Sequence, residues 1–257
     1  MMKALISPIS LEEAKIVAEG GADIIDIKNI KEGSLGASFP WIISDVVRNL
    51  STYNVLFSAT LGDLPYKPGT ASLAALGAAA AGAQYIKAGL YDVASEEQGV
   101  DMMVAIRRAC KDHNSAITVV TAGYADYRRF GGLDTDTLVR IAHRSDSDVV
   151  MVDTAIKDGA TLFDVMSFEE IREFVRAGHQ AGLKVALAGS IRTEHMPALR
   201  EINADIVGVR GAVCGKGLSL NDRRTGIEKD RVMAFMDALR RGQPLNGKPV
   251  QLAHSAA

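Results

Sequence analysis

Residues 21–28 read GADIIDIK, a Gly-Ala turn followed by an apolar run that ends in a lysine. A run of this kind is typical of a buried strand, and the glycine before it is typical of the end of a helix. Further apolar runs recur roughly 20 to 35 residues apart, the length of a strand-plus-helix unit. The predicted strands are residues 3–7, 23–28, 54–60, 84–88, 116–121, 148–153, 184–188 and 205–210.

Helix-patterned segments lie between these strands. Ser10 and Glu13 are spaced as a capping box at the start of one helix, and Ser167 and Glu170 repeat the spacing before a helix that Gly182 ends. The predicted helices are residues 11–19, 39–50, 70–81, 96–111, 135–144, 168–181, 194–201 and 229–240.

Eight strands alternating with eight helices predict an α/β fold, a single (β/α)8 TIM barrel. An open doubly wound sheet would place a glycine-rich fingerprint after the first strand, whereas residues 7–10 read SPIS. No linker composition interrupts the pattern, so we expect one catalytic domain over residues 1–241. Residues 242–257 lack helical periodicity and are expected to form a loosely ordered tail.

Composition excludes several classes of function. The chain has 257 residues, 47% of them hydrophobic, and a net charge of −2 without a basic block, so we expect no nucleic-acid partner. Residues 73–83 are too short an apolar stretch to cross a bilayer, and the N-terminus lacks a signal-peptide pattern. Two cysteines and five scattered histidines predict neither a disulfide framework nor a metal site. We therefore expect a cytoplasmic protein without membrane contact, metal or cofactor.

Charged residues fall at the ends of three predicted strands. Side chains two apart share a strand face, so Asp26 and Lys28 on the second strand, Lys87 on the fourth and Asp153 on the sixth should point into the barrel. Lys157 follows the sixth strand. These ends meet at the carboxyl-terminal mouth, where barrels of this type carry out chemistry. An alternative interpretation is a set of neutralised structural ion pairs, which are poor devices for stability.

A lysine among other cations and low-dielectric walls has a lowered pKa, which makes its free amine available to attack a carbonyl. Neighbouring carboxylates can then move protons. The cluster predicts a Schiff-base enzyme acting on an aldehyde or ketone. On the residues alone, Lys157 competes with Lys28 as the nucleophile, because many Schiff-base aldolases hold their lysine on strand six.

Small residues follow the seventh and eighth strands. Gly189, Ser190, Gly211 and Ala212 would expose backbone N–H groups, the usual device by which barrels bind phosphate. Arg210, inward by alternation with Gly208, would add a charged hydrogen bond. The alternative is two tight turns around an interior arginine. We therefore predict a small phosphorylated aldehyde or ketone as substrate.

Two loops beside the mouth and one helix have possible functions that the sequence does not decide. Residues 29–39 read NIKEGSLGASF and could form a lid. Arg128 and Arg129, in residues 122–133, could contact a second phosphate. The alanine-rich helix of residues 71–83 could pack on its own barrel or on another copy in a homo-oligomer.

Several motifs together resemble one enzyme family. They are SPISLEEAKIVAEGGADIIDIKNIKEGSLGASFPWII (7–43), YIKAGL (85–90), VDTAIKDG (152–159), LFDVMSFEEI (162–171), VALAGSI (185–191) and DIVGVRGAVC (205–214). The resemblance, over residues 5–226, is to the (5-formylfuran-3-yl)methyl phosphate (4-HFC-P) synthases of methanofuran biosynthesis. Where the family pattern more often reads KNPKEGSLGA, this chain has Ile30, which affects loop stiffness more than chemistry.

The resemblance implies a reaction and residue roles. It implies a carbon–oxygen lyase acting on phosphates, which condenses two molecules of glyceraldehyde 3-phosphate to a phosphorylated furan aldehyde with loss of one phosphate and water. Lys28 would form the Schiff base, Lys87 would transfer protons, and Asp153 and Lys157 would match the acidic and basic family positions.

Three alternatives use the same scaffold. A class I Schiff-base aldolase of the deoxyribose-phosphate type would stop at the aldol. A barrel of the indole-glycerol-phosphate synthase kind would use lysine and carboxylate as acid and base without an imine. A non-catalytic phosphate-binding barrel would bind ligand without turnover.

Overall fold

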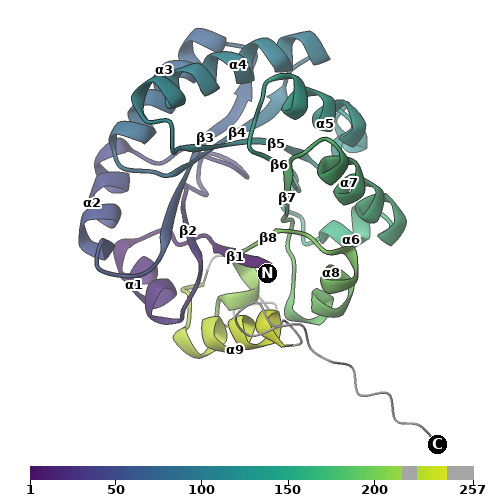
Figure 1. Ribbon diagram of the computed structural model, residues 1–257. Helices are drawn as coiled ribbons and strands as arrows, with labels where there is room; N and C mark the ends of the chain where they lie inside the picture. The colour runs from purple at the N-terminus through teal and green to yellow at the C-terminus, as the bar shows by residue number, and fades with distance from the viewer. Residues whose placement is uncertain (216–224, 242–257) are drawn as a thin grey trace, which may run out of the picture.

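The computed structural model describes residues 1–215 and 225–241 of the chain. Eight parallel strands close into a barrel in the order of the sequence, and helices surround it (Figure 1). This architecture confirms the predicted (β/α)8 TIM barrel. The strands are β1 Lys3–Ile6, β2 Ile24–Ile27, β3 Leu56–Pro65, β4 Tyr85–Asp92, β5 Thr118–Tyr124, β6 Val149–Asp153, β7 Lys184–Leu187 and β8 Ile206–Val209.

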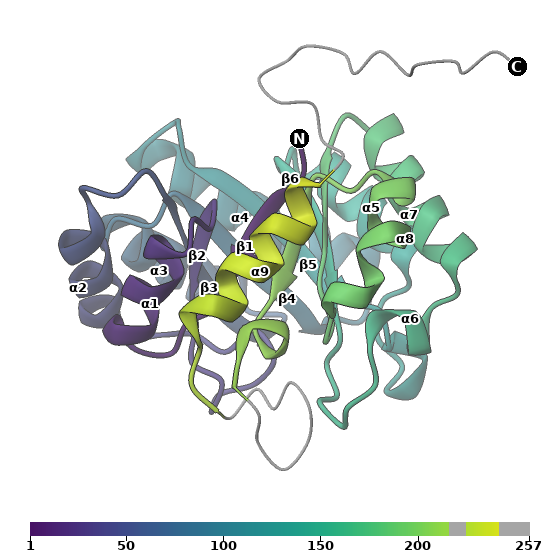
Figure 2. The same cartoon turned by 90° about the horizontal axis from the view of Figure 1, so that it is seen from below.

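The predicted helices all form, several within one or two residues of their expected ends. A short helix after β6 was not predicted, because four residues are too few to show a helical period. The helices are α1 Leu11–Glu19, α2 Pro40–Leu50, α3 Pro68–Ala80, α4 Glu96–His113, α5 Thr135–Arg144, the unpredicted α6 Leu162–Val165, α7 Phe168–Gln180, α8 Met196–Ile202 and α9 Lys229–Arg240. In Figure 2, α9 lies against the outside of the barrel, where it contacts α1.

The two predicted helix starts differ in how they are capped. The Ser167 side chain accepts from the Glu170 N–H and the Glu170 carboxylate accepts from the Ser167 N–H, which confirms a reciprocal capping box. Ser10 also caps its helix, accepting from the Glu13 N–H at 3.2 Å. The Glu13 carboxylate, however, accepts from the N–H of Ile9 and not of Ser10, so the second half of that predicted box is wrong.

Alternation along the strands separates two layers of core. Ile25, Ile27 and Ile86 belong to the apolar layer between strands and helices. Tyr85 and Met151 belong to a smaller cluster inside the barrel. The predicted faces of β2, β4 and β6 are therefore confirmed, and the same alternation turns Asp26, Lys87 and Asp153 inward.

Strands β3 and β4 run past their predicted ends. The β3–β4 ladder shifts register between Thr60 and Asp63 and then continues through Leu64, opposite Leu90. Gly62, at a φ of +117°, allows this bulge. Residues 61–65 lie beyond the predicted end of this strand, but pairing with β4 keeps them in the sheet and carries Asp63 to the barrel mouth.

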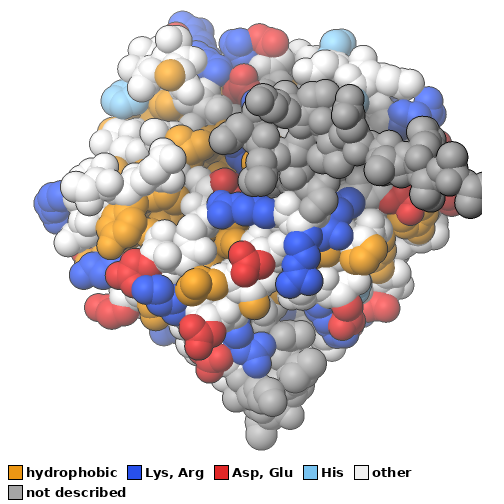
Figure 3. Space-filling model, turned by 60° about the horizontal axis from the view of Figure 1, so that its bottom comes forward, with side chains coloured by type: hydrophobic (Ala, Val, Ile, Leu, Met, Phe, Trp, Pro, Cys, Tyr) orange, Lys and Arg blue, Asp and Glu red, His pale blue; other side chains and the backbone are white. Residues whose placement is uncertain are grey.

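Acidic and basic side chains lie interspersed on the face shown in Figure 3, with apolar side chains between them. Among the described residues, no helix is both long enough and apolar enough to cross a membrane. The tail predicted over residues 242–257 lies outside the described part of the chain.

Candidate active site

A cavity of about 940 Å³ opens at the carboxyl ends of the strands. Its lining includes the ten residues that the sequence analysis places at the barrel mouth or in the loops after β7 and β8, and they come from five strands or the loops that follow them. They are Asp26, Lys28, Lys87, Asp153, Lys157, Gly189, Ser190, Arg210, Gly211 and Ala212. Among residues 1–215 and 225–241, no group of three or more His, Cys, Asp or Glu side chains is arranged to hold a metal ion.

Asp26 and Lys87 form a buried ion pair at the floor of this cavity. Lys87 Nζ lies 3.0 Å from Asp26 Oδ2, and the two side chains are 1% and 0% exposed. Ser7 and Ser58 donate their hydroxyls to the same carboxylate at 3.0 and 2.8 Å. Burial acts to raise the pKa of Asp26, but the charges of Lys87 and Lys28 outweigh it and lower that pKa. Asp26 is therefore an ionised hydrogen-bond acceptor beneath the lysines.

Asp153 and Lys157 form a second pair at the end of β6. Lys157 Nζ lies 2.7 Å from Asp153 Oδ1 and 3.0 Å from Thr154 Oγ1. Burial acts to raise the pKa of Asp153, but the charges of Lys157 and Lys28 hold it below its ordinary range. The folded protein therefore holds the amine of Lys157 in an ion pair.

Lys28 differs from Lys87 and Lys157 in what its amine contacts. Its Nζ donates to the carbonyl oxygen of Ser34 at 3.3 Å, and within the described residues it forms no ion pair. The side chain is only 9% exposed. Burial lowers the pKa of Lys28 to about 8, although the attraction of Asp153 and Asp26 opposes this shift. Lys28 thus offers a readily deprotonated amine.

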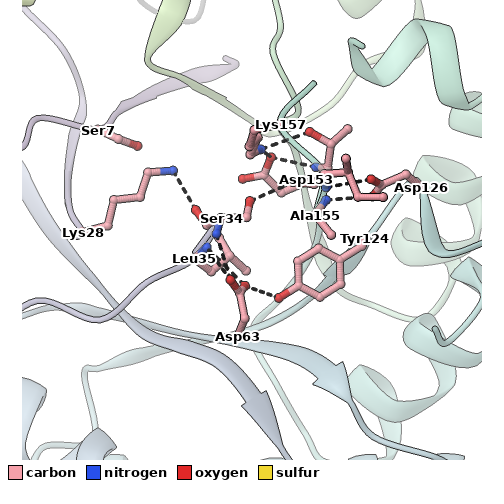
Figure 4. Close-up of polar contacts among 12 residues, drawn as sticks. Ser7, Lys28, Ser34, Leu35, Asp63, Tyr124, Asp126, Asp153, Ala155 and Lys157 are labelled. Carbon is pink, nitrogen blue, oxygen red and sulfur yellow. Dashed lines mark hydrogen bonds and ion pairs between the residues drawn. The ribbon is translucent and has the colours of Figure 1, made fainter. Parts of the chain in front are cut away.

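The loops after β2 and β6 are fastened to each other and to the loop after β5 (Figure 4). The Ser34 hydroxyl donates to the Thr154 carbonyl at 2.8 Å. The buried Asp126 carboxylate accepts from the N–H groups of Ala155 and Ile156 at 2.7 and 2.9 Å. These contacts hold Lys28 and Lys157 on opposite sides of one opening.

Sequence reasoning missed the residues that support the charged cluster. Strand alternation could have found Ser58, which shares an inward face with Leu56 and lies opposite Asp26 in the β2–β3 ladder. It could not have found Asp126, which follows the end of β5 in a loop where alternation no longer applies. The missed residues are Ser7, Ser34, Ser58, Asp63, Tyr124 and Asp126.

Residues of the loops after β7 and β8 line the cavity. Gly189 and Ser190 adopt positive φ angles of +111° and +48°, a sharp turn that aims the chain across the mouth. In the described part of the chain, the N–H groups of Ser190, Gly211 and Ala212 donate to no other protein atom. A phosphate fits such a group of donors.

Arg210 lies in the cavity wall, but its guanidinium is turned toward the start of α1. It donates to the Glu13 carboxylate at 2.7 and 3.2 Å, to the Ser7 carbonyl at 2.9 Å and to the Thr225 carbonyl at 3.3 Å. This geometry does not favour the predicted charged hydrogen bond to phosphate. It favours a role for Arg210 in ordering the loop after β8.

Arg128 and Arg129 are also engaged by carboxylates. Arg128 pairs with Glu170 and Arg129 with Asp158, each at 2.7 Å and on the protein surface. Neither residue lines the cavity. The suggestion that they contact a second phosphate therefore finds no support in their positions.

A closed barrel with lysines and carboxylates at its carboxyl-terminal mouth defines the class of a TIM-barrel enzyme. Residues 4–236 match the sequence model of a family described as 4-HFC-P synthase. The chain belongs to this 4-HFC-P synthase family.

Relatives named (5-formylfuran-3-yl)methyl phosphate synthase come from several archaea. The protein of Methanocaldococcus jannaschii is 55% identical over 232 residues, covering 90% of this chain and 97% of the relative. That of Methanococcus maripaludis strain C7 is 52% identical over 240 residues, covering 93% and 100%. That of Archaeoglobus fulgidus is 50% identical over 238 residues, covering 93% and 99%.

Solved structures share the fold at much lower identity. The 3-hexulose-6-phosphate synthase of Salmonella typhimurium superposes with a TM-score of 0.65 at 17% identity, covering 93% of this chain and 98% of that one. KGPDC of Streptococcus mutans also reaches 0.65, at 10% identity, with coverage of 94% and 98%. These similarities show the barrel fold alone.

Proposed function

We propose that this protein condenses two molecules of glyceraldehyde 3-phosphate to (5-formylfuran-3-yl)methyl phosphate, in the biosynthesis of methanofuran or a related carrier, through an imine on Lys28. Atoms balance when one phosphate and two waters leave. Family membership supports the product. The site supports the chemistry, because the cavity is lined by amines, by carboxylates and by the glycine-containing loops after β7 and β8.

The state of the three lysines carries the assignment of the nucleophile. Lys87 and Lys157 each lie on an ionised carboxylate, at 3.0 and 2.7 Å, whereas Lys28 rests on a backbone carbonyl. An amine must be neutral to attack a carbonyl carbon. The lowered pKa of Lys28, about 8, therefore favours it over Lys157, which competed with it on sequence alone.

The first steps form the imine. The neutral amine of Lys28 adds to the carbonyl of one triose phosphate, as its keto isomer or an equivalent, and the resulting carbinolamine loses water. Lys87, hydrogen-bonded to ionised Asp26, can donate the proton that the leaving oxygen needs. The neutral Lys87 amine left behind can then remove the acidified C–H proton next to the imine, which gives an enamine.

The later steps join the two substrates. The enamine carbon attacks the aldehyde carbon of the second triose phosphate, and the new alkoxide takes a proton. Lys157 with Asp153, on the other side of the opening, can supply this proton and assist the eliminations that follow. Loss of phosphate, dehydration, ring closure and release of Lys28 complete the furan.

The deciding experiment incubates the protein with glyceraldehyde 3-phosphate, with and without borohydride, and records ultraviolet absorbance. We expect a rising furan-aldehyde band without reductant and a reduced triose adduct on the Lys28 peptide with it, located by mass spectrometry. An adduct without the band would favour the aldolase alternative. Turnover that survives borohydride would favour an imine-free barrel, and saturable binding with neither signal would favour a binding protein.

The rate should follow the protonation of Lys28. Only the neutral amine attacks, and its pKa is about 8, so kcat/KM should rise with pH through about 8 and level off above it. At pH 7 about one tenth of Lys28 is neutral, roughly two orders of magnitude more than for an ordinary lysine. A profile of kcat/KM from pH 6 to 10 measures this. If kcat/KM instead rises only with an apparent pKa near 10, the pKa of Lys28 is not lowered and the prediction is wrong.

A further inference from the structure

Asp63 is a half-buried carboxylate at the barrel mouth that the proposed chemistry does not use. It lies beyond the bulge of β3 and accepts from three donors (Figure 4). Its oxygens accept from the Ser34 N–H at 2.8 Å and from the Leu35 N–H at 3.2 Å. The Tyr124 hydroxyl donates to it as well. Asp63 thus joins the loop after β2 to the end of β5.

The loop of residues 29–39 folds down onto the mouth around this carboxylate. Leu35 is fully buried in the apolar cluster inside the barrel. The Thr60 hydroxyl donates to the Gly36 carbonyl at 2.6 Å, and the Asn29 N–H donates to the same oxygen at 2.9 Å. In the structure the loop suggested as a lid is therefore closed, with Ser34 directly over the Lys28 amine.

Two glycines of the family-like motifs make this contact possible. Gly33, in KEGSLGA, has a φ of +128°, and a Cβ there would collide with the Asp63 carboxylate. A Cβ on Gly89, in YIKAGL, would collide with the Tyr124 hydroxyl and lie 2.8 Å from Leu35 Cδ1. The contact to Asp63 and Tyr124 thus accounts for the need for glycine at both motif positions.

Tyr124 is held rigidly on the other side. Its ring packs edge-on against Tyr91 and Phe130, with centroids 5.5 and 5.9 Å apart. Burial, and next the charge of Asp63, raise the pKa of Tyr124 well above its ordinary value. The hydroxyl therefore stays protonated and remains a donor to Asp63.

We propose that Asp63 is a positioning residue: with Tyr124 it clamps Ser34 and Leu35 onto the barrel mouth, and so holds the Ser34 carbonyl that orients and desolvates Lys28. This role rests on the proposed function only in that Lys28 is the reacting amine. An amide at position 63 has one acceptor oxygen in place of two and carries no charge. If its oxygen keeps the Ser34 N–H, its NH2 group faces the Tyr124 hydroxyl, which then no longer donates, and the charge-assisted hydrogen bonds of the clamp are lost.

The test measures loop closure and Lys28 reactivity without substrate. Trypsin reports the loop, because Lys31 is exposed within it, and competitive acetylation against pH, read by mass spectrometry, reports Lys28. In Asp63→Asn we expect tryptic cleavage at Lys31 to rise on the order of tenfold and acetylation of Lys28 at pH 7 to fall about tenfold, as water returns to the amine. Tyr124→Phe should show smaller changes of the same sign. Asp112→Asn, on the exposed end of α4, should show neither.

The direction of the acetylation change separates the clamp from a charge effect. Removing a nearby negative charge destabilises a lysine cation and would make Lys28 more reactive at pH 7, whereas an opened clamp makes it less reactive. Faster acetylation, or unchanged cleavage at Lys31 in folded Asp63→Asn, overturns the proposal. If the melting curve shows that Asp63→Asn does not fold, Tyr124→Phe replaces it, because phenylalanine keeps the ring packing. Faster cleavage at Lys31 with slower acetylation of Lys28 in that variant supports the clamp, and faster acetylation or unchanged cleavage overturns it. Both assays need no turnover, so the clamp can hold even if the wild-type protein makes no furan.

Discussion

Replacing Lys28 with methionine should abolish the borohydride-trapped adduct and lower furan formation on the order of 10⁴-fold or more. Methionine fills a similar volume but has no amine, and Lys87 and Lys157 are held in ion pairs with Asp26 and Asp153. Steady-state absorbance and the mass of the reduced protein measure both effects.

Lys28→Arg is the matched control, because it keeps a cation but forms no imine. It should be as inactive as Lys28→Met, which separates nucleophilic from purely electrostatic catalysis. A trapped adduct that survives in Lys28→Met would place the nucleophile elsewhere, with Lys157 the first to examine by peptide mapping.

Lys28→Met should also raise the free energy of unfolding near neutral pH. The folded-state pKa of Lys28, about 8, lies below its ordinary 10.5, so folding disfavours the cation. This cost is complete below pH 8 and fades as pH rises from 8 toward 10.5. Lys28→Met should therefore gain on the order of 1–3 kcal/mol at pH 7 and progressively less above pH 8. Thermal melts at pH 7 and pH 10 measure the difference.

Replacing Lys87 with methionine should damage both stability and turnover. It leaves the fully buried Asp26 with its serine hydroxyls but without its ion-pair partner, and breaking a buried pair in this way costs about 3–5 kcal/mol. Turnover should fall about 10²- to 10⁴-fold, because the proton-transferring group is lost. Imine trapping should persist, since Lys28 remains, but it should be slower, because Lys87 no longer donates the proton for loss of water. Denaturant unfolding, furan absorbance and borohydride trapping distinguish the three effects.

The double variant Asp26→Asn with Lys87→Met provides the control. Removing both charges should recover most of the lost stability but none of the turnover, because an apolar and amide pair needs no compensating charge. A double variant as unstable as Lys87→Met alone would show that packing of the lysine stem, and not the ion pair, holds this part of the barrel.

Much of the site could be predicted because strand alternation is a local rule. Asp26, Lys87 and Asp153 each follow from the side-chain period of one strand, and all of them reach the mouth. Asp63 escaped that rule, because the bulge at Gly62 breaks the period before it. The rule predicts the position of Arg210 in the cavity wall but not the direction of its guanidinium. The guanidinium pairs with Glu13 on α1, and a pattern along β8 cannot reveal a partner on another element.

The sequence by itself determined the barrel, the inward faces of its strands and the gathering of lysines and carboxylates at one end. Those features depend on the order of apolar and polar residues along each segment, which is written directly in the chain. Only the tertiary structure decided the surroundings of each lysine, and with them the lowered pKa of Lys28. Lys28 and Lys157 look alike in sequence, but one meets a backbone carbonyl and the other a carboxylate. The charge of a buried amine is set by burial and by atoms a few ångströms away, and the folded barrel draws those atoms from loops and strands far apart in the chain.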